Sequence, residues 1–354
     1  MVVHLRVDEA ASLCIYMAPG TRLQTDLYVC LRAHARMSTL LAAFVLSPSV
    51  TKASNNRAFW DLPNDLMIII MSHLTNDEDR HTMRLVCRHW HMAVNANVSR
   101  LTGNMYWTCN EHVLMLPQFS HVASVNLSQC TLVGHIRALK FLPALKKLEL
   151  NWCTGLTPAS LGPLADLTGL THLDISGCPE AVTDDSMRHL AGMGNSLEWL
   201  SLQGCPLLSS SGLAWLRTFC RLSYLDLSGT RVVNLLHLSG CTSLRRLRLS
   251  GCEQLADGAF HSLAGLPALA DLDLRGSRHL MTATLLDDLA RLPGLRKLDL
   301  EGSEDLTDAN LDSLMQLTGL THLNISDCAL LTQTGLNQLT LRMSRHCAVF
   351  QGYS

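Results

Sequence analysis

Cysteine is the residue type whose number and spacing in this chain could most readily support chemistry. The 354 residues include 13 cysteines. Six of them occupy the ninth position of a recurring nine-residue frame: Cys130, Cys153, Cys178, Cys205, Cys252 and Cys328. Such a series could ligate a metal, form disulfides or pack as small, weakly polar groups. The same position holds Thr230, Ser277 and Ser303 in other copies of the frame, which favours packing and turn hydrogen bonding.

Elementary geometry argues against a metal at these cysteines. Neighbouring parallel strands lie about 4.8 Å apart, so the first and third sulfurs of the series would be roughly 10 Å apart. Zinc needs four ligands at about 2.3 Å. A disulfide between two adjacent cysteines is sterically conceivable, but the cysteine count is odd and nothing indicates secretion. We therefore expect reduced, structural cysteines, no metal site and no cofactor.

No other set of residues has the spacing of a catalytic centre. His89 and His91 flank Trp90 and project from different sides of a predicted helix, which makes them poor joint metal ligands. The sequence contains neither a phosphate-binding loop motif nor a dinucleotide-binding motif. The formal charge is −2. It gives no reason to expect nucleic acid as a partner, because phosphate binding needs a clustered positive surface. We expect a protein that is not an enzyme and binds neither nucleic acid nor membrane.

The elements that must position the cysteines belong to a repeat. From Leu145 to Leu320 the frame recurs over seven intervals and 175 residues, a mean period of 25, within the range of about 20–29 residues for leucine-rich repeats. Positions four and six of L-x-x-L-x-L-x-x-C point inward from a short strand, and only stacked neighbours can bury them. The sequence predicts an α/β solenoid of about nine repeats over residues 122–340, a horseshoe with parallel strands on its concave face.

A helical return is predicted after each strand. Thr183, Thr307 and Thr332 precede apolar stretches with helical spacing, where a hydroxyl can cap the free N–H groups of the first turn. The interval from Leu222 to Leu244 is only 22 residues, which predicts a loop or a stunted helix in that repeat.

The predicted concave wall carries the candidate target-binding residues, because positions three, five and seven point away from the core. Aromatic residues and arginine dominate binding hot spots, and two of each adjoin in the middle of the array. The candidates, with the two aromatics ranked first, are Trp199, Tyr224, Arg246, Arg248 and Asp271. The alternative is that charges merely neutralise one another across strands, with Arg248 between Asp226 and Asp273 and Arg275 beside Glu301.

Residues 58–101 form a separate predicted unit, a helical hairpin. Pro63 suits a first helical turn. Two apolar stripes with helical spacing follow: Leu66, Ile69, Ile70, His73 and Leu74, then Met83, Val86, Cys87, Trp90 and Val94. A hairpin of this size is marginal as an independent core. It must pack on the next domain or offer an apolar face to a partner.

This segment resembles an F-box. It contains L-P-x-D-L-x-x-x-I-x-x-x-L followed by V-C-R-x-W, matched by Leu62, Pro63, Asp65, Leu66, Ile70, Leu74, Val86, Cys87, Arg88 and Trp90. The array that follows resembles the cysteine-containing leucine-rich repeats of F-box proteins, and the two resemblances cover roughly residues 58–340. Arg80 stands where the family usually has leucine, and Ile69 where a polar residue is common. Either departure could weaken adaptor binding.

The resemblance implies a function and partners. F-box proteins bind the Skp adaptor of a cullin-RING ubiquitin ligase, so it implies adaptor contacts by Leu62, Pro63, Leu66, Ile70, Leu74, Val86, Cys87 and Trp90. It also implies a protein substrate on the repeats, in the cytoplasm, the nucleus or both. The chain would be the substrate-recognition subunit of an SCF-type ligase and would supply no catalytic group. The alternative is a repeat scaffold or sensor without ligase function, in which the hairpin caps the solenoid.

The flanking segments carry weaker signals. Residues 1–57 are predicted to be a poorly structured leader. Their last half is free of acidic residues after Asp26, which also resembles a transit peptide. The apolar run at 40–46 is too short to span a bilayer, and Met37 could be the true initiator. Residues 102–121 are predicted to be a linker or N-terminal cap of the solenoid, and residues 341–354 a C-terminal cap or tail.

Overall fold

The computed structural model describes residues 2–7, 11–16, 100–102, 121–130, 136–256, 258–276, 279–280, 282–343 and 346–351. The chain divides into two units, residues 1–98 and 99–354. In the first unit the described residues are an antiparallel pair, β1 (Val2–Val7) and β2 (Ala11–Tyr16). This pair lies inside the segment predicted as a poorly structured leader, and its runs contain the β-branched residues that favour strands.

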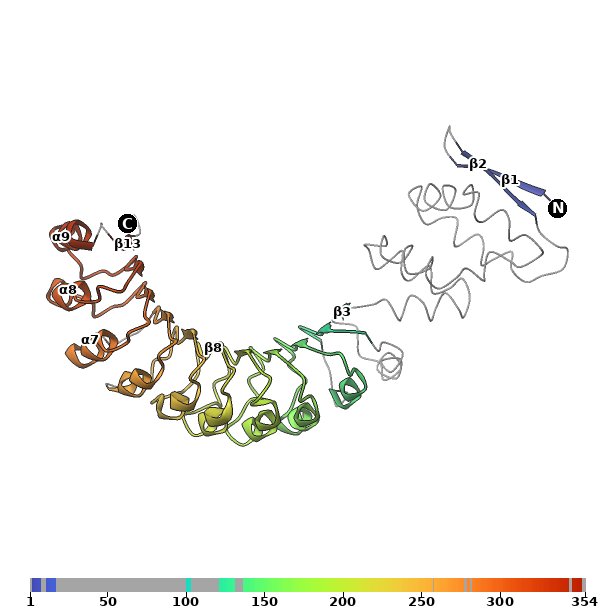
Figure 1. The fold of residues 1–354 in the computed structure, drawn as a ribbon, viewed down its shortest axis with the longest axis horizontal. Coiled ribbons are helices and arrows are strands. Elements are labelled where there is room, and N and C mark those ends of the chain that lie inside the picture. The colour runs from blue at the N-terminus through green and yellow to red at the C-terminus, as the bar shows by residue number, and fades with distance from the viewer. Residues whose placement is uncertain are drawn as a thin grey trace. The chain divides into compact units, whose positions relative to one another are not determined.

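The second unit contains one parallel sheet, with eleven strands among the described residues, in chain order. The strands are β3 (Arg100–Thr102), β4 (Ser124–Asn126), β5 (Lys147–Glu149), β6 (His172–Asp174), β7 (Trp199–Ser201), β8 (Tyr224–Asp226), β9 (Arg246–Arg248), β10 (Asp271–Asp273), β11 (Lys297–Asp299), β12 (His322–Asn324) and β13 (Ala348–Phe350). They line the inner side of a curved array, with the helices outside (Figure 1). The predicted α/β leucine-rich-repeat solenoid is thus confirmed.

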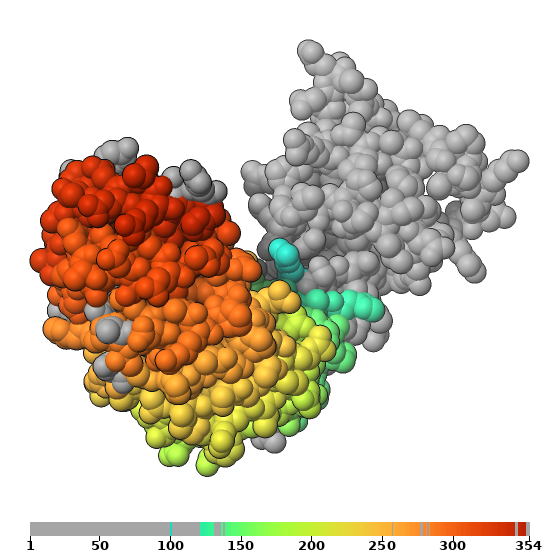
Figure 2. Space-filling model, turned by 60° about the vertical axis from the view of Figure 1, so that its left-hand side comes forward, coloured from blue at the N-terminus to red at the C-terminus, as the bar shows by residue number. Residues whose placement is uncertain are grey.

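The sheet extends beyond the nine copies of the frame. The nine strands β4–β12 carry those copies, and each pairs with its neighbour at the same frame position, as Leu148 pairs with Leu173 and Leu173 with Leu200. β3 and β13 add one strand at each end. β13 lies in the stretch predicted as a C-terminal cap or tail. The coils follow one another in chain order, from green to red, in the space-filling view (Figure 2).

Each return segment is helical, as predicted, but most are tighter than an α-helix. The early returns are 3-10 helices: η3 (Ile136–Phe141), η4 (Pro158–Asp166), η5 (Ser186–Met193), η6 (Gly212–Thr218), η7 (Leu236–Gly240) and η8 (Ala259–Gly265). The later ones are α-helices: α7 (Ala283–Ala290), α8 (Asp308–Met315) and α9 (Gln333–Met343). A 3-10 helix rises about 2.0 Å per residue instead of 1.5 Å, so it crosses the convex side with fewer residues. The short repeat has the shortest of these helices, η7, which confirms the stunted helix.

Two of the three predicted threonine caps, Thr307 and Thr332, lie at the N-cap, whereas Thr183 lies two residues before Asp185, the N-cap of η5, and still accepts a helical N–H. The Thr183 hydroxyl accepts the Ser186 N–H at 3.2 Å, and the Thr332 hydroxyl accepts the Gly335 N–H at 3.1 Å. Thr307 and Asn310 form a reciprocal capping box at the start of α8. Each cap satisfies helical donors that would otherwise lack a partner.

The ninth-position thiols join adjacent coils. The sulfhydryl groups of Cys153, Cys178 and Cys252 donate to the carbonyls of Leu127, Leu150 and Leu227 in the preceding coil, at 3.0, 3.2 and 3.1 Å. Burial raises the pKa of the Cys153 and Cys205 thiols to about 12 and that of Cys178 to about 11. These thiols therefore stay protonated donors at neutral pH. They have the packing and hydrogen-bonding role that the sequence predicted.

Membrane-spanning helices and metal-ion clusters are both absent from the part of the chain that the structure describes. Among these residues, no helix has both the length and the apolar character needed to cross a bilayer. Within the same ranges, no three histidine, cysteine or acidic side chains gather where they could hold a metal ion.

Candidate functional site on the concave sheet

Three aromatic rings stack along the third column of the sheet. The parallel register places Trp199 beside Tyr224, and their ring centroids lie 4.8 Å apart with planes only 5° from parallel. His172 continues the stack at 6.4 Å from Trp199. All three side chains are half-buried. Because each ring covers the face of the next, the stack presents a pre-formed row of ring edges to a ligand.

His172 is a site residue that the sequence prediction left out. It occupies the same frame position as Trp199 and Tyr224, one strand earlier, and this shared column was the available signal. An imidazole can stack like the larger rings and also offers hydrogen-bonding nitrogens. Its Nδ1 lies 2.8 Å from the Thr171 hydroxyl, which fixes the ring in line with its neighbours.

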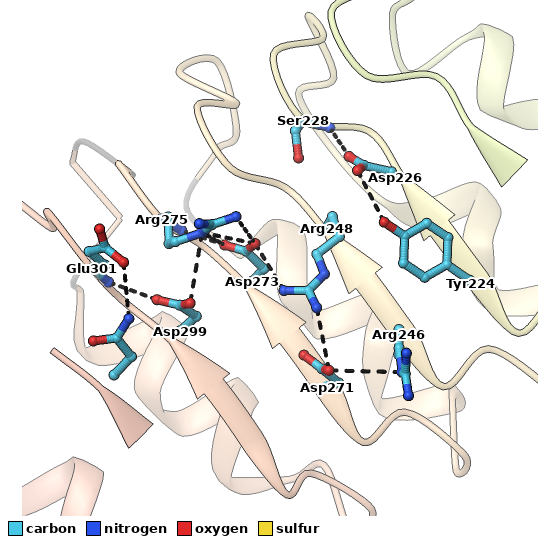
Figure 3. A network of polar contacts seen from close by, with 11 residues as sticks. Tyr224, Asp226, Ser228, Arg246, Arg248, Asp271, Asp273, Arg275, Asp299 and Glu301 are labelled. Atoms are coloured by element: carbon cyan, nitrogen blue, oxygen red, sulfur yellow. Dashed lines mark hydrogen bonds and ion pairs between the residues drawn. The ribbon is translucent and has the colours of Figure 1, made fainter. Parts of the chain in front are cut away.

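An ionic network continues the wall across the next strands (Figure 3). Arg248 contacts Asp273 at 3.0 Å and Asp271 at 3.5 Å. Arg246 lies 3.9 Å from Asp271 and is 63% exposed. Arg275 contacts Asp273 at 2.9 Å and Asp299 at 3.7 Å. The five predicted target-binding residues therefore lie together on β7–β10, and Arg246 has the most loosely held guanidinium of the three.

Asp273 is the centre of this network. It is 0% exposed, and its carboxylate lies between the guanidinium groups of Arg248 and Arg275. Burial alone would raise the pKa of its carboxyl, but hydrogen bonds from Arg275 and Arg248 outweigh burial and hold the pKa below its usual value. A buried carboxylate with two guanidinium partners is a rigid anchor for this part of the wall.

The charge-neutralisation alternative is correct in outline, since the strand register places Arg248 between Asp226 and Asp273 as predicted. Arg248 pairs with Asp271 and Asp273, whereas Asp226 accepts the Tyr224 hydroxyl at 3.2 Å and the Ser228 N–H at 2.9 Å. Burial, and then the Asp226 charge, raise the pKa of Tyr224 to about 12. Glu301, predicted beside Arg275, interacts with it electrostatically and also accepts the Asn324 amide at 3.0 Å.

Most fifth-position acids and amides have a structural role that the sequence analysis missed. The Asp or Asn side chain accepts the backbone N–H of the residue two positions later, at 2.9–3.1 Å. This contact is an Asx-turn that ends the strand. It occurs at Asn126, Asp174, Asp226, Asp273, Asp299 and Asn324. The recurrence of Asp and Asn in one column was its sequence signal, and Arg248 interrupts that column with a cation.

Trp152 is an exposed aromatic that the prediction did not include. It holds the frame's eighth position in a left-handed conformation with φ 60°, where the next six repeats have glycine. A side chain at Gly177 would clash with the Trp152 ring, since a Cβ at that position would lie 2.5 Å from it. Gly177 therefore leaves room for the exposed indole at the rim of the sheet.

The predicted adaptor-binding residues, Leu62, Pro63, Leu66, Ile70, Leu74, Val86, Cys87 and Trp90, lie outside the described residues.

Comparison with known proteins adds information on both parts of the chain. Residues 59–99 match the F-box-like family. The chain is 29% identical, over 171 residues, to a transport inhibitor response 1-like protein of Oryza sativa subsp. japonica. That alignment covers 48% of this chain and 27% of the rice protein, so the chain matches about a quarter of that relative's length.

Solved structures resemble the solenoid in fold. The crystal structure of a TLR13–ssRNA13 complex superposes with a TM-score of 0.56 at 21% identity, over 74% of this chain and 37% of that one. An internalin from Listeria monocytogenes gives a TM-score of 0.45 at 19% identity, over 68% of this chain and 84% of the internalin. At these identities the first likeness supports the fold and nothing further.

Proposed function

We propose that this F-box/leucine-rich-repeat protein is the substrate-recognition subunit of an SCF-type cullin-RING ubiquitin ligase. The observation that carries the proposal is the F-box-like match at residues 59–99, immediately before a repeat solenoid whose inner wall carries a pre-formed aromatic and ionic surface. The similarity to a rice transport inhibitor response 1-like protein over 171 residues supports the same proposal. In this proposal the F-box-like segment binds a Skp-type adaptor, and through it a cullin, in the cytoplasm or nucleus.

The protein's contribution to ubiquitination would be proximity. The adaptor fixes one end of the chain, and the concave wall holds a target protein near the ubiquitin-conjugating enzyme. Holding two reactants together converts a bimolecular step into an effectively unimolecular one. No side chain of this protein is required to take part in the chemistry, which agrees with a receptor that is not itself an enzyme.

Replacing both Leu62 and Pro63 with alanine should abolish co-purification of the adaptor. The two residues begin the matched motif, and their apolar contacts with a partner helix would be lost. The measurement is a pulldown of purified adaptor with the full chain, alongside a thermal melt to show that the repeats remain folded. Undiminished adaptor binding by the double variant would contradict the proposal. If the chain captures a target but never the adaptor, it is a repeat scaffold without ligase function.

Replacing both Trp199 and Tyr224 with alanine should weaken target binding by about 2 kcal/mol or more, roughly 30-fold in Kd. The stack is already ordered, so a ligand that uses it bears little ordering cost. The target would first be identified by affinity purification under proteasome inhibition, and its Kd then measured.

The matched control is His322→Ala with Phe350→Ala, which removes a separate stacked pair in the same sheet, at 6.4 Å. That control should retain target binding, and both double variants should retain the adaptor. Equal target loss in the two double variants would show that Trp199 and Tyr224 have no special role.

A further inference from the structure

The charges of the concave wall are divided between the two ends of its strands. Counting histidine as neutral, positions two and three of the nine frames hold six basic and two acidic residues, whereas positions five and seven hold six acidic and two basic residues. The strand starts are therefore basic and the strand ends acidic. We call the six basic residues at the strand starts, all of them exposed, the basic margin: Lys146, Lys147, Arg245, Arg246, Arg296 and Lys297.

The basic margin has its least neutralised charges at β9 and β11. Arg245 directly precedes β9, and Lys297 is the first residue of β11. Neither side chain has an ion pair with another residue that the structure describes. The coils on either side of Arg245 place Ser223 and Ala270 next to it, each with a backbone hydrogen bond of 2.9 Å. Neither neighbour carries a counter-charge, so a ligand can approach Arg245 without displacing an existing partner.

Asp271, on β10 between these two strands, neutralises little of the basic margin. Its side chain is only 17% exposed, and it lies closer to Arg248, at 3.5 Å, than to Arg246, at 3.9 Å, as Figure 3 shows. The Arg246 side chain is 63% exposed. Arg246 therefore adds an accessible guanidinium beside Arg245.

The acidic strand ends restrict what can bind to the basic margin. Positions three and five of a strand are about 7 Å apart, which is within the Debye length of about 8 Å at physiological salt. A uniformly charged polyanion such as nucleic acid, laid on the basic margin, would be repelled by Asp226 and Asp299 at position five. A narrow protein segment that carries its acidic side chains on one side avoids this repulsion.

The strand spacing specifies such a segment. Two strand intervals separate β9 from β11, about 10 Å, and three residues of an extended chain cover about the same distance. A segment that crosses the strands can therefore place one carboxylate opposite each basic pair when its acids are three residues apart. Two intervals in the other direction, from β9 to β7, lead to the ring edges of Trp199, which fit an apolar side chain. Asp271 would repel a phosphate that bridged the two basic pairs.

We infer that the basic margin binds an acidic segment of the target protein, extended across the strands. The segment carries two carboxylates three residues apart and an apolar side chain three residues before or after them. The inference deepens the target recognition proposed above. It rests on the concave wall as the target site and does not depend on adaptor binding.

The test uses the N-acetylated, C-amidated peptide Leu-Ser-Gly-Glu-Ser-Gly-Glu, whose binding to the full chain is measured by isothermal titration calorimetry. Arg245→Glu with Lys297→Glu should weaken binding by at least about tenfold. The matched control is Arg188→Glu with Arg217→Glu, two exposed arginines of η5 and η6. It changes the net charge by the same amount outside the concave wall and should retain the peptide. If the first variant melts early, Arg245→Gln with Lys297→Gln decides, and it should also weaken binding.

Three further peptides test the chemistry of the segment. A peptide with both glutamates replaced by glutamine should not bind, and one with its glutamates adjacent, Leu-Ser-Gly-Glu-Glu-Ser-Gly, should bind at least about threefold more weakly. A peptide with phosphoserine at the first glutamate and glutamine at the second should also bind more weakly. Tighter binding of the phosphoserine peptide overturns the inference, because the ligand would then be a phosphate.

The inference is also overturned by equal losses in the two charge-reversal variants, by equal binding of the spaced and adjacent peptides, or by no binding at about 1 mM peptide. Its failure can be told from that of the proposed function. If an identified target is lost on replacing Trp199 and Tyr224 but retained by Arg245→Glu with Lys297→Glu, the target site stands and the acidic segment is wrong. Loss of the adaptor interaction alone would leave the peptide results unchanged.

Discussion

Replacing Asp273 with asparagine is expected to lower the free energy of unfolding by about 3 kcal/mol. The carboxylate is fully buried, and Arg248 and Arg275 both donate to it. Removing one member of a buried ionic cluster leaves its partners uncompensated, at a cost of about 3–5 kcal/mol. The lower end applies here, since the Arg248 and Arg275 side chains are 27% and 46% exposed and water can partly solvate them. Urea unfolding at pH 7 measures the effect.

The matched control is Asp299→Asn. Asp299 holds the same frame position and the same type of turn, accepting the Glu301 N–H at 3.1 Å. It is part exposed and, among the described residues, contacts one arginine, at 3.7 Å. Asparagine can preserve the turn contact in both variants, so the difference isolates the charge. We expect a loss below about 1 kcal/mol for Asp299→Asn. Equal losses in the two variants would contradict a special role for Asp273.

The same variant should show a defined pH dependence. The pKa of Asp273 is lower in the folded protein than its usual value of 3.8, so the folded state favours the charged form. Its stabilising contribution is therefore complete above about pH 5 and is lost as the pH falls through the folded pKa. The stability difference between the original protein and Asp273→Asn should shrink below about pH 4. A difference that stays constant to acid pH would show that the charge is not responsible.

Replacing Leu173 with alanine should cost about 2–5 kcal/mol. Leu173 is 0% exposed and lies between Leu148 and Leu200 on the neighbouring strands, so truncation leaves a cavity that three coils cannot close. Urea denaturation of the full chain, followed by circular dichroism, measures the loss.

Cys178→Ser, five residues further along the same coil, should cost much less, about 1 kcal/mol. A serine hydroxyl can donate to the Leu150 carbonyl as the thiol does at 3.2 Å, and threonine fills the slot at Thr230, where its hydroxyl donates to Leu227 at 2.6 Å. The cost is not zero, because the hydroxyl of Ser303 in this slot is buried without a hydrogen-bond partner among the described residues. If Cys178→Ser is as damaging as Leu173→Ala, the thiols have a role beyond packing.

These predictions connect the wall's stability to its proposed use. The aromatic stack and the Asp273 network lie on consecutive strands, β6–β8 and β9–β11. A wall that is held by internal ion pairs and stacked rings loses little side-chain entropy when a ligand binds. Within the described part of the wall, Arg246 has one ion pair, at 3.9 Å from Asp271. A ligand can recruit this cation at least cost, because Asp271 still has Arg248 as a partner.

The sequence by itself determined the repeat, the strands and the neighbours along each column. A constant frame in a parallel ladder places equal positions side by side, so the stacking of Trp199 on Tyr224 follows from spacing alone. The buried leucines and the cysteine ladder follow from the same period. The F-box-like match at residues 59–99 agrees with the motifs that predicted it, while the contacts of those motif residues stay a prediction.

The tertiary structure decided which partners the charged side chains choose. The repeat frame places Asp226, Asp271 and Asp273 on the strands next to or beside Arg248. Only side-chain reach and burial select Asp271 and Asp273 over Asp226 as its ion-pair partners. It also decided the ends of the array. β3 and β13 keep only the inward fourth position of the frame, as Leu101 and Val349, and the adjoining strand edge satisfies their backbone groups.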